Sequence, residues 1–156
     1  DALRALPQIT RLRLHTRLPI VLPERVDAEL LDWIGALPWP LVVVVHVNHA
    51  NEIDDSVRTA CAALRQRGVH LLNQSVLLRG VNDSAEALAE LSEALFKAGV
   101  LPYYLHLLDR VQGTAHFEVP EAEALALRDA IHARLPGYLV PKLVREVAGE
   151  AGKSAY

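Results

Sequence analysis

The sequence predicts an α/β domain built from a repeated strand–helix unit. Short apolar runs typical of buried strands alternate with amphipathic helical segments, in the order βαβαβαβα followed by a terminal segment. A length of 156 residues suits one domain with a sizeable core. Helical crossovers between apolar strands favour parallel strands with helices outside them. This order fits either an open doubly wound sheet or an arc of a barrel.

The first strand–helix unit precedes a run of four valines. Residues 11–16, RLRLHT, alternate between apolar and polar side chains and predict a strand, and the proline-rich stretch LPIVLPERV predicts a long loop after it. Asp27 begins a short predicted helix, which Pro38 and Pro40 end. The valine run that starts at Val42 is then the second strand.

Two further units follow with clear boundaries. Asp54 or Asp55 is placed to cap a helix, and residues 69–78, VHLLNQSVLL, predict the third strand. Ser84 begins the most regular amphipathic helix of the chain, and Gly99 stands just past its end.

The last unit leads into a short C-terminal segment. Residues 100–108 predict the fourth strand, and Pro120 stands where a helix places its first residue. A last apolar segment covers residues 138–144. We therefore expect the strand–helix units to occupy residues 1–137 and a C-terminal segment of the same domain to occupy residues 138–156.

The composition excludes several classes of protein. Net charge is −3, 51% of residues are hydrophobic and 22% are charged, and the lysines and arginines are scattered, which argues against a nucleic-acid-binding surface. No apolar run approaches the roughly 20 residues of a membrane span, and the N-terminus lacks the pattern of a signal peptide. The lone cysteine, Cys61, cannot form an internal disulfide. We expect a cytoplasmic protein with no nucleic-acid or membrane partner.

The start of the sequence predicts a piece of a longer protein. The chain contains no methionine, and its first strong element is already a strand. An open arc of four strands would leave apolar edges exposed, so a non-catalytic half-barrel scaffold that pairs with another chain, or a homo-oligomer, is one hypothesis.

Polar side chains gather where each predicted strand ends. Parallel α/β folds bind their ligands outside the carboxyl ends of the strands, so these side chains should share one rim. They are His15, Thr16, Arg17, His46, Asn48, His49, Asn51, Glu52, Asn73, Gln74, Ser75, Tyr103, Tyr104, His106 and Asp109. Such clustering over four strands predicts a functional site at this rim.

Individual residues at the rim carry different weight. His46, Asn48 and His49 follow buried valines and need polar partners, which favours a functional role. Gln74 interrupts an apolar strand, and an unpaired buried amide costs roughly 1–3 kcal/mol, which favours a ligand contact. A histidine such as His106 is, by itself, more typical of a core or rim position.

The spacing H-x-x-H-x-x-E raises a second enzyme hypothesis. His46, His49 and Glu52 are residue types that bind zinc or iron, so a metal-dependent lyase or hydrolase is an alternative. The spacing alone is weak support, because His46 and His49 would point to opposite faces of a strand.

The motifs at these positions resemble a known family. They are RLRLHTRLPIVLPERV, HVNHANEID, LLNQSVLLRGVND, LPYYLHLLDRVQGTAHFEV and GYLVPKLVREVAGEAGK. Collinear over nearly the whole chain, they are similar to the lysine 2,3-aminomutase family of radical S-adenosylmethionine enzymes, and within it to the branch that makes β-lysine for elongation factor P. The resemblance implies an isomerase acting on L-lysine, and the last four βα units of a partial (βα)6 TIM-like barrel.

The resemblance also implies cofactors and residue roles. The family uses pyridoxal 5'-phosphate, S-adenosylmethionine and a 4Fe–4S cluster. Lys153 matches the lysine that forms the Schiff base with pyridoxal phosphate, and Asp109 and Glu146 match acids that bind the side-chain ammonium of the substrate. More loosely, the resemblance assigns Gln74, His46, Asn48 and His49 to the cavity of the two organic cofactors.

The chain departs from the family pattern at several points. The C-x-x-x-C-x-x-C motif that binds the cluster is missing, and Cys61 cannot replace three thiolates. Ser84 stands where other members carry a cysteine, so we expect no structural zinc. The loop before Lys153, GEAGK, is less rich in glycine than in those members. We therefore expect the chain by itself to be inactive in radical chemistry.

Overall fold

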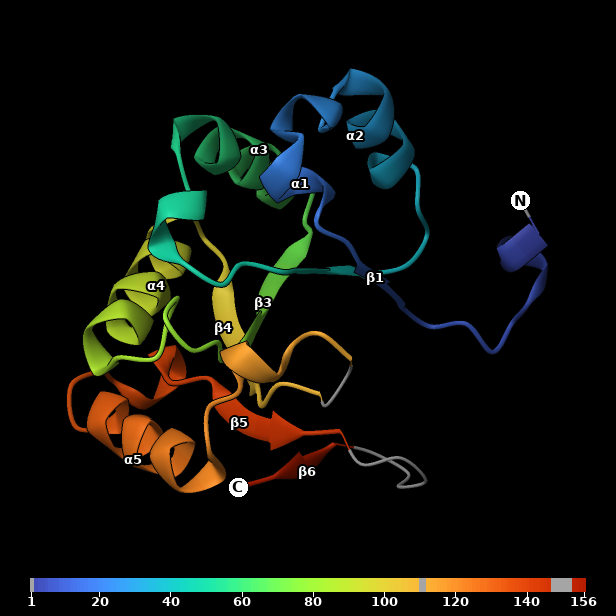
Figure 1. The fold of residues 1–156 in the computed structure, drawn as a ribbon. Helices are drawn as coiled ribbons and strands as arrows, with labels where there is room; N and C mark the ends of the chain where they lie inside the picture. The colour runs from blue at the N-terminus through green and yellow to red at the C-terminus, as the bar shows by residue number, and fades with distance from the viewer. Residues whose placement is uncertain (1, 110–111, 147–152) are drawn as a thin grey trace.

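The computed structural model describes residues 2–109, 112–146 and 153–156 of the chain, and it shows an α/β fold. Its strands form one six-stranded sheet (Figure 1). In chain order the strands are β1 (Leu12–His15), β2 (Leu41–Val45), β3 (His70–Val76), β4 (Leu101–His106), β5 (Lys142–Arg145) and β6 (Ser154–Ala155).

The helices connect successive strands and lie together around one side of the sheet (Figure 1). The α-helices are α1 (Leu18–Val21), α2 (Ala28–Gly35), α3 (Asp55–Gln66), α4 (Ala85–Lys97) and α5 (Glu121–His132). Single turns of 3-10 helix are η1 (Ala2–Ala5), η2 (Pro23–Arg25), η3 (Ala50–Glu52), η4 (Ala115–Phe117) and η5 (Gly137–Leu139).

The order of the strands differs from that of a doubly wound sheet. The strands are arranged in the order β1-β2-β3-β4-β5-β6; β1 to β5 are parallel to one another, and β6 is antiparallel to β5. A doubly wound sheet reverses its strand order at a switch point, and no reversal occurs among the described strands. Crossovers of one hand therefore place the connecting helices on one side.

The predicted helix starts are confirmed where a side chain caps the helix. Asp27, Asp54 and Ser84 are N-caps whose side chains accept a backbone N–H three residues further on, at 2.9, 2.9 and 3.1 Å. Each cap satisfies a donor that the first helical turn leaves free.

Three details of the sequence prediction were wrong. Pro120 is the N-cap of α5 and not its first helical residue, because its ψ of 144° is extended. The loop predicted after the first strand contains α1 and η2, since Pro19 is buried in the first turn of α1. The predicted segment 138–144 divides into η5 and β5.

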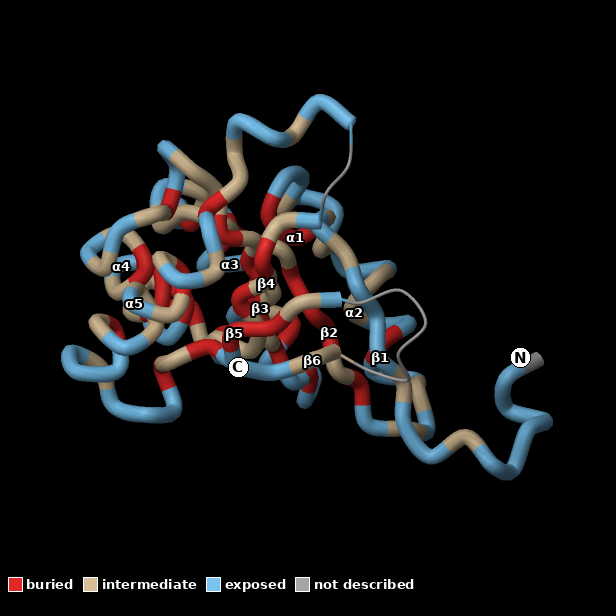
Figure 2. Tube along the Cα trace, turned by 60° about the horizontal axis from the view of Figure 1, so that its bottom comes forward, coloured by how far each residue is buried: buried red, intermediate tan, exposed pale blue. Residues whose placement is uncertain are grey.

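The sheet has one face packed against the helices. Side chains that alternate along the strands, such as Val43 and Val45 of β2, join a core with Leu64 of α3 and Leu95 of α4. Leu105 of β4 belongs to a second core cluster under α4 and α5. Figure 2 shows the buried positions concentrated along the central strands.

The opposite face of the sheet, here called the far face, carries the alternate side chains of each strand, those that do not join the core under the helices. Strand register and burial assign to it Arg13, His15, Val42, Val44, His46, Leu72, Gln74, Val76, Tyr104 and His106. Polar and aromatic groups concentrate toward the carboxyl ends of these strands. A ligand that binds the far face would therefore meet most of these polar and aromatic groups near that edge.

A register shift in β4 re-aims its last residues. Asn73 of β3 is opposite Pro102, whereas Gln74 is opposite Tyr104, so Tyr103 is an extra residue. The Tyr103 and Tyr104 rings have centroids 3.8 Å apart and planes tilted by 37°, as expected if both turn toward the same face. After the shift, Tyr104 and His106 share the far face with Gln74.

Two buried asparagines fix the carboxyl ends of β2 and β3. Asn73 Oδ1 accepts from Val47 N at 2.8 Å, and Asn73 Nδ2 donates to Val47 O at 3.1 Å. Asn82, which is fully buried, accepts from Leu78 N at 2.7 Å and donates to Asn48 O and Val76 O, both at 2.9 Å. These amides replace the ladder bonds that end with the strands.

Replacing Asn82 with alanine should lower the free energy of unfolding by about 2–3 kcal/mol, because it leaves three backbone groups unpaired at a buried position. Urea denaturation followed by circular dichroism measures the change. As a matched control, Asn51→Ala at an exposed position should change stability by no more than about 0.5 kcal/mol. Equal midpoints for the two variants would contradict this role for Asn82.

Candidate functional site

A cleft of about 410 Å³ lies at the carboxyl edge of the sheet. Residues at or just after the ends of β1 to β5 line it, so it occupies the place where parallel α/β folds bind ligands. The lining residues are Arg17, His46, Asn48, Gln74, Ser75, Val76, His106, Leu107, Leu108, Asp109 and Glu146.

Lys153 reaches this edge from the start of β6. β6 is antiparallel to β5 with Arg145 opposite Ser154, so Glu146 and Lys153 follow as neighbours across the two strands. Lys153 Nζ lies 3.0 Å from Glu146 Oε1 and 2.9 Å from His106 Nε2. It also stands 4.9 Å from the centre of the Tyr104 ring. The amine is thus held by an acid, an imidazole and an aromatic ring.

Two polar atoms near the lysine have no partner. Gln74 Nε2 lies 2.6 Å from His106 Nε2, while Gln74 Oε1 and His46 Nε2 are the buried side-chain atoms of the described residues that lack a hydrogen bond. Unsatisfied buried polar atoms are rare in folded proteins and costly. Their position on the far face is consistent with a site that a ligand completes.

Burial, together with nearby positive charge, favours neutral imidazoles in the cleft. The pKa values of His15, His46 and His106 are all lowered, chiefly by burial, and the Lys153 ammonium lowers each of them further. The hydrogen bond from Lys153 is the main reason that the pKa of Glu146 is lowered. At neutral pH the site therefore presents uncharged histidines beside a paired carboxylate.

The structure brings together some of the predicted site residues and separates others. Gln74, His46, Asp109 and Glu146 line the cleft, with Lys153 bonded to Glu146. The six residues before Lys153, most of the GEAGK loop, lie outside the described residues.

Asn48 and His49 are engaged with the backbone. Asn48 lines the cleft, but its Oδ1 accepts from Val76 N at 2.9 Å and joins β2 to β3. His49 does not line the cleft; it is the N-cap of η3, and its Nδ1 accepts from Asn51 N at 3.2 Å. Both side chains stabilise the turn after β2.

The side-chain contacts argue against a metal site formed by His46, His49 and Glu52. Glu52 Oε1 accepts from the backbone N–H groups of Asn48 and His49 at 2.7 and 2.9 Å, and Oε2 pairs with Arg17 at 3.3 Å. Across residues 2–109, 112–146 and 153–156, no three His, Cys, Asp or Glu side chains group closely enough to hold a metal ion. Glu52 serves as a capping residue.

His106 and Tyr104 are the residues that sequence reasoning underrated. The sequence places both residues at the rim but singles out neither, and by itself His106 is typical of a core or rim histidine. His106 instead contacts Gln74 and Lys153 directly. The alternation of β4 could not reveal this, because the extra residue Tyr103 inverts it.

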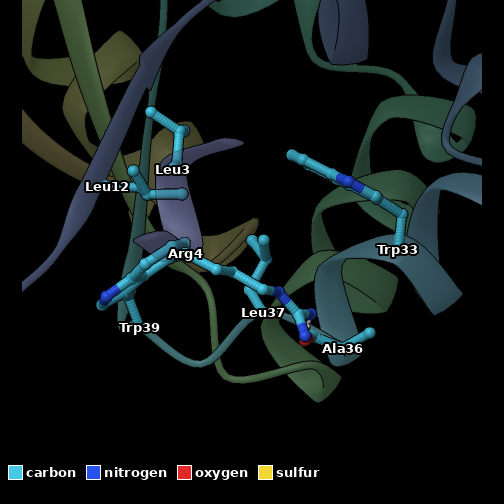
Figure 3. Close-up of a pocket in the computed structure, with 7 residues that line it drawn as sticks. All are labelled: Leu3, Arg4, Leu12, Trp33, Ala36, Leu37 and Trp39. Atoms are coloured by element: carbon cyan, nitrogen blue, oxygen red, sulfur yellow. Dashed lines mark hydrogen bonds between the residues drawn. The ribbon is translucent and has the colours of Figure 1, made fainter. Parts of the chain in front are cut away.

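A second hollow, of about 300 Å³, lies where the N-terminal turn meets β1 and α2 (Figure 3). Leu3, Leu12, Trp33, Leu37, Trp39, Ala36 and Arg4 line it. Arg4 Nη2 donates to Ala36 O at 2.7 Å, so the one charged group of the lining is already engaged. This hollow lacks the acids and bases of the cleft.

Curated relatives match the chain along almost its whole length. A protein of Escherichia coli K12 named L-lysine 2,3-aminomutase is 54% identical over 97% of this chain and 44% of its own length. Proteins of the same name from Haemophilus influenzae and Clostridium subterminale are 49% and 38% identical, over 99% and 97% of the chain and 46% and 36% of their own lengths. The chain thus spans under half the length of these relatives.

Other comparisons bear on the fold. A radical SAM methyltransferase from Sphaerobacter thermophilus has a similar structure, with a TM-score of 0.56 and 17% identity, over 75% of this chain and 37% of that one. No protein-family model matches the chain. In the described part of the chain, no helix combines the length and the apolar character needed to cross a membrane.

The histidine pKa values predict that stability falls as the pH falls. Because the folded state lowers these pKa values below the ordinary value near 6.5, the unfolded state binds more protons between about pH 7.5 and about pH 5.5. Urea unfolding at the two pH values should show lower stability at the acid one. His106→Gln should reduce that difference, whereas His132→Gln at an exposed position of α5 should preserve it. If His106→Gln left the pH dependence of stability unchanged, His106 would not be one of the groups that cause it.

Proposed function

This chain belongs to the L-lysine 2,3-aminomutase family, and on that premise we propose that it supplies the C-terminal part of an enzyme that converts L-lysine to β-lysine. The observation that carries the proposal is that a lysine amine pairs with Glu146, one of two carboxylates that line the cleft. Lys153 is bonded to Glu146, and Asp109 lines the same cleft. A reaction that moves an amino group needs an electrophile that binds the amine. It also needs carboxylates that bind the charged ammonium of the substrate.

The proposed architecture is the last four βα units of a partial (βα)6 barrel. Support comes from the sequential parallel order of β1 to β5 and from helices confined to one side of the sheet. The far face would then be the interior of the barrel, which explains why its polar groups gather at the carboxyl edge. Such an interior would exclude water from a reactive species.

Lys153 fits the role of the lysine that holds pyridoxal 5'-phosphate. Its side chain is 26% exposed and its amine lies over the Tyr104 ring, so the amine is accessible yet partly sheltered. The cofactor, when bound, would supply the aldehyde that carries the migrating nitrogen. The residues of this chain would bind and orient it through the amine.

Asp109 and Glu146 fit the role of binding the side-chain ammonium of L-lysine. Glu146 already accepts a hydrogen bond from an ammonium, that of Lys153, at 3.0 Å. Charge-assisted hydrogen bonds of this kind are stronger than neutral ones, and a partly dry cleft strengthens them further. Two carboxylates at the far end of the substrate would fix its length as well as its charge.

The described residues do not fit the iron–sulfur cluster. Cys61 is the chain's lone cysteine, it is buried in α3, and burial raises the pKa of its thiol to about 11. A cluster requires several thiolates, so its ligands would come from residues outside this chain. The unpartnered atoms of His46 and Gln74 would face S-adenosylmethionine.

The biological setting is also a proposal. The motif resemblance within the family supports β-lysine for elongation factor P as the product's use, and a cytoplasmic enzyme. Hydrolysis of elongation factor P from cells that lack the gene, followed by chromatography against L-lysine and β-lysine standards, would test it. The loss of β-lysine is expected, and β-lysine at the parental level would refute this setting.

Borohydride reduction in the presence of pyridoxal 5'-phosphate should label Lys153. The chain contains three lysines, and Lys97 and Lys142 are exposed positions away from the cleft lining. Peptide mapping by mass spectrometry reads the site of the label. Predominant label on Lys142 or Lys97 would overturn the role of Lys153.

Asp109→Asn and Glu146→Gln should each raise the KM for L-lysine roughly tenfold or more in the active enzyme, because each removes one charge-assisted contact. Steady-state kinetics measure the change. Glu90→Gln, at an exposed position of α4, is the matched loss of a carboxylate and should leave KM unchanged. An unaltered KM in both cleft variants would exclude them from substrate binding.

A further inference from the structure

Two side-chain nitrogen atoms lie within hydrogen-bond distance of Nε2 of His106. Gln74 Nε2 lies 2.6 Å away and Lys153 Nζ 2.9 Å away. A lysine ammonium can only donate hydrogen bonds, so Nε2 of His106 is an unprotonated acceptor. The ring is therefore neutral and carries its proton on Nδ1.

The surroundings of His106 maintain that neutral state. Burial is the largest cause of its lowered pKa, and the charges of Lys153 and His46 lower it further, whereas Glu146 and Asp109 act in the opposite direction. Tyr104 packs edge-on against the imidazole, with ring centroids 5.8 Å apart. Gln74 and Tyr104 together fix the position of the ring.

Glu146 and His106 hold the lysine in physically different ways. The contact with Glu146 is an ion pair, so most of its strength depends on the positive charge of Lys153. An amine that condenses with an aldehyde must first lose that charge. The bond to a neutral imidazole persists when the lysine becomes uncharged, because it is a hydrogen bond between neutral groups.

We propose that His106, held by Gln74, is the positioning residue for Lys153: it keeps the lysine nitrogen at the cleft in both of its protonation states. The inference rests on the proposed role of Lys153. In the reaction, the Lys153 ammonium releases its proton to solvent, the nitrogen lone pair forms a bond to the aldehyde carbon, and the aldehyde oxygen leaves as water. His106 fixes the place of the nitrogen throughout, without accepting its proton.

The test compares two substitutions of His106 in the full chain. His106→Gln retains an uncharged acceptor, whereas His106→Phe retains a flat ring and removes the acceptor. The measurement is the rate at which pyridoxal 5'-phosphate labels Lys153, trapped with borohydride, across pH up to the plateau where the lysine is uncharged. At the plateau, the Phe variant should react roughly three- to tenfold more slowly and the Gln variant close to the parent.

A second variant and a second reagent separate positioning from loss of structure. Glu146→Gln removes the ion pair and leaves the His106 acceptor in place, so its plateau rate should stay close to that of the parent. Labelling with acetic anhydride, which needs no oriented approach, should give the His106 variants similar plateau rates. A plateau for the Phe variant equal to that of the parent would overturn the proposal.

A separate readout remains decisive if the cofactor proposal fails. If the parent chain is never labelled at Lys153, the proposed function is wrong, and NMR titration of His106 then tests the contact itself. Lys153→Met should raise the pKa of His106, because it removes a neighbouring positive charge. Lys97→Met, at an exposed position of α4, is the control and should leave that pKa unchanged. No difference between these two variants would overturn the inference.

Discussion

The side-chain amide of Asn73 is the interaction on which the geometry of the carboxyl edge depends. It binds the backbone N–H and C=O of Val47, two residues beyond the end of β2. These bonds replace the hydrogen bonds that a neighbouring strand would make there. His46 precedes Val47 and Gln74 follows Asn73, and the shared constraint sets these two side chains on the far face. A hydrogen bond in the core thus determines how the cleft is lined, which makes the site a consequence of the fold and not of a mobile loop.

Much of the fold was predictable because local chemistry and long-range packing agree. Asp27, Asp54 and Ser84 satisfy helix donors and stand where the apolar pattern changes period, so they marked real boundaries. The prediction differed from the structure where two local sequence signals compete. The proline-rich stretch after β1 predicted a loop, yet Pro19 fits the first turn of α1, where a missing N–H costs nothing.

The site was predictable only in part, because the local sequence does not show which partner satisfies a polar side chain. Lys153, Asp109 and Glu146 were named through the family resemblance, and the structure sets all three near the cleft without testing their chemistry. Asn48 and His49 were named because polar groups after valines need partners, but their partners are backbone groups of a tight turn. Sequence shows that a polar group must be satisfied, and it does not show whether a ligand or the chain itself does so.

The extra residue in β4 changes which of the strand's side chains point to the far face and which point to the core. Ahead of Tyr103 the alternation assigns Leu101 to the far face, and beyond it the assignment is inverted, so that Leu105 enters the core while His106 faces the cleft. Removing one residue there would exchange the two environments, exposing a leucine and burying an imidazole. The single extra residue at Tyr103 is therefore what brings His106 to the cleft and Leu105 to the core at the same time.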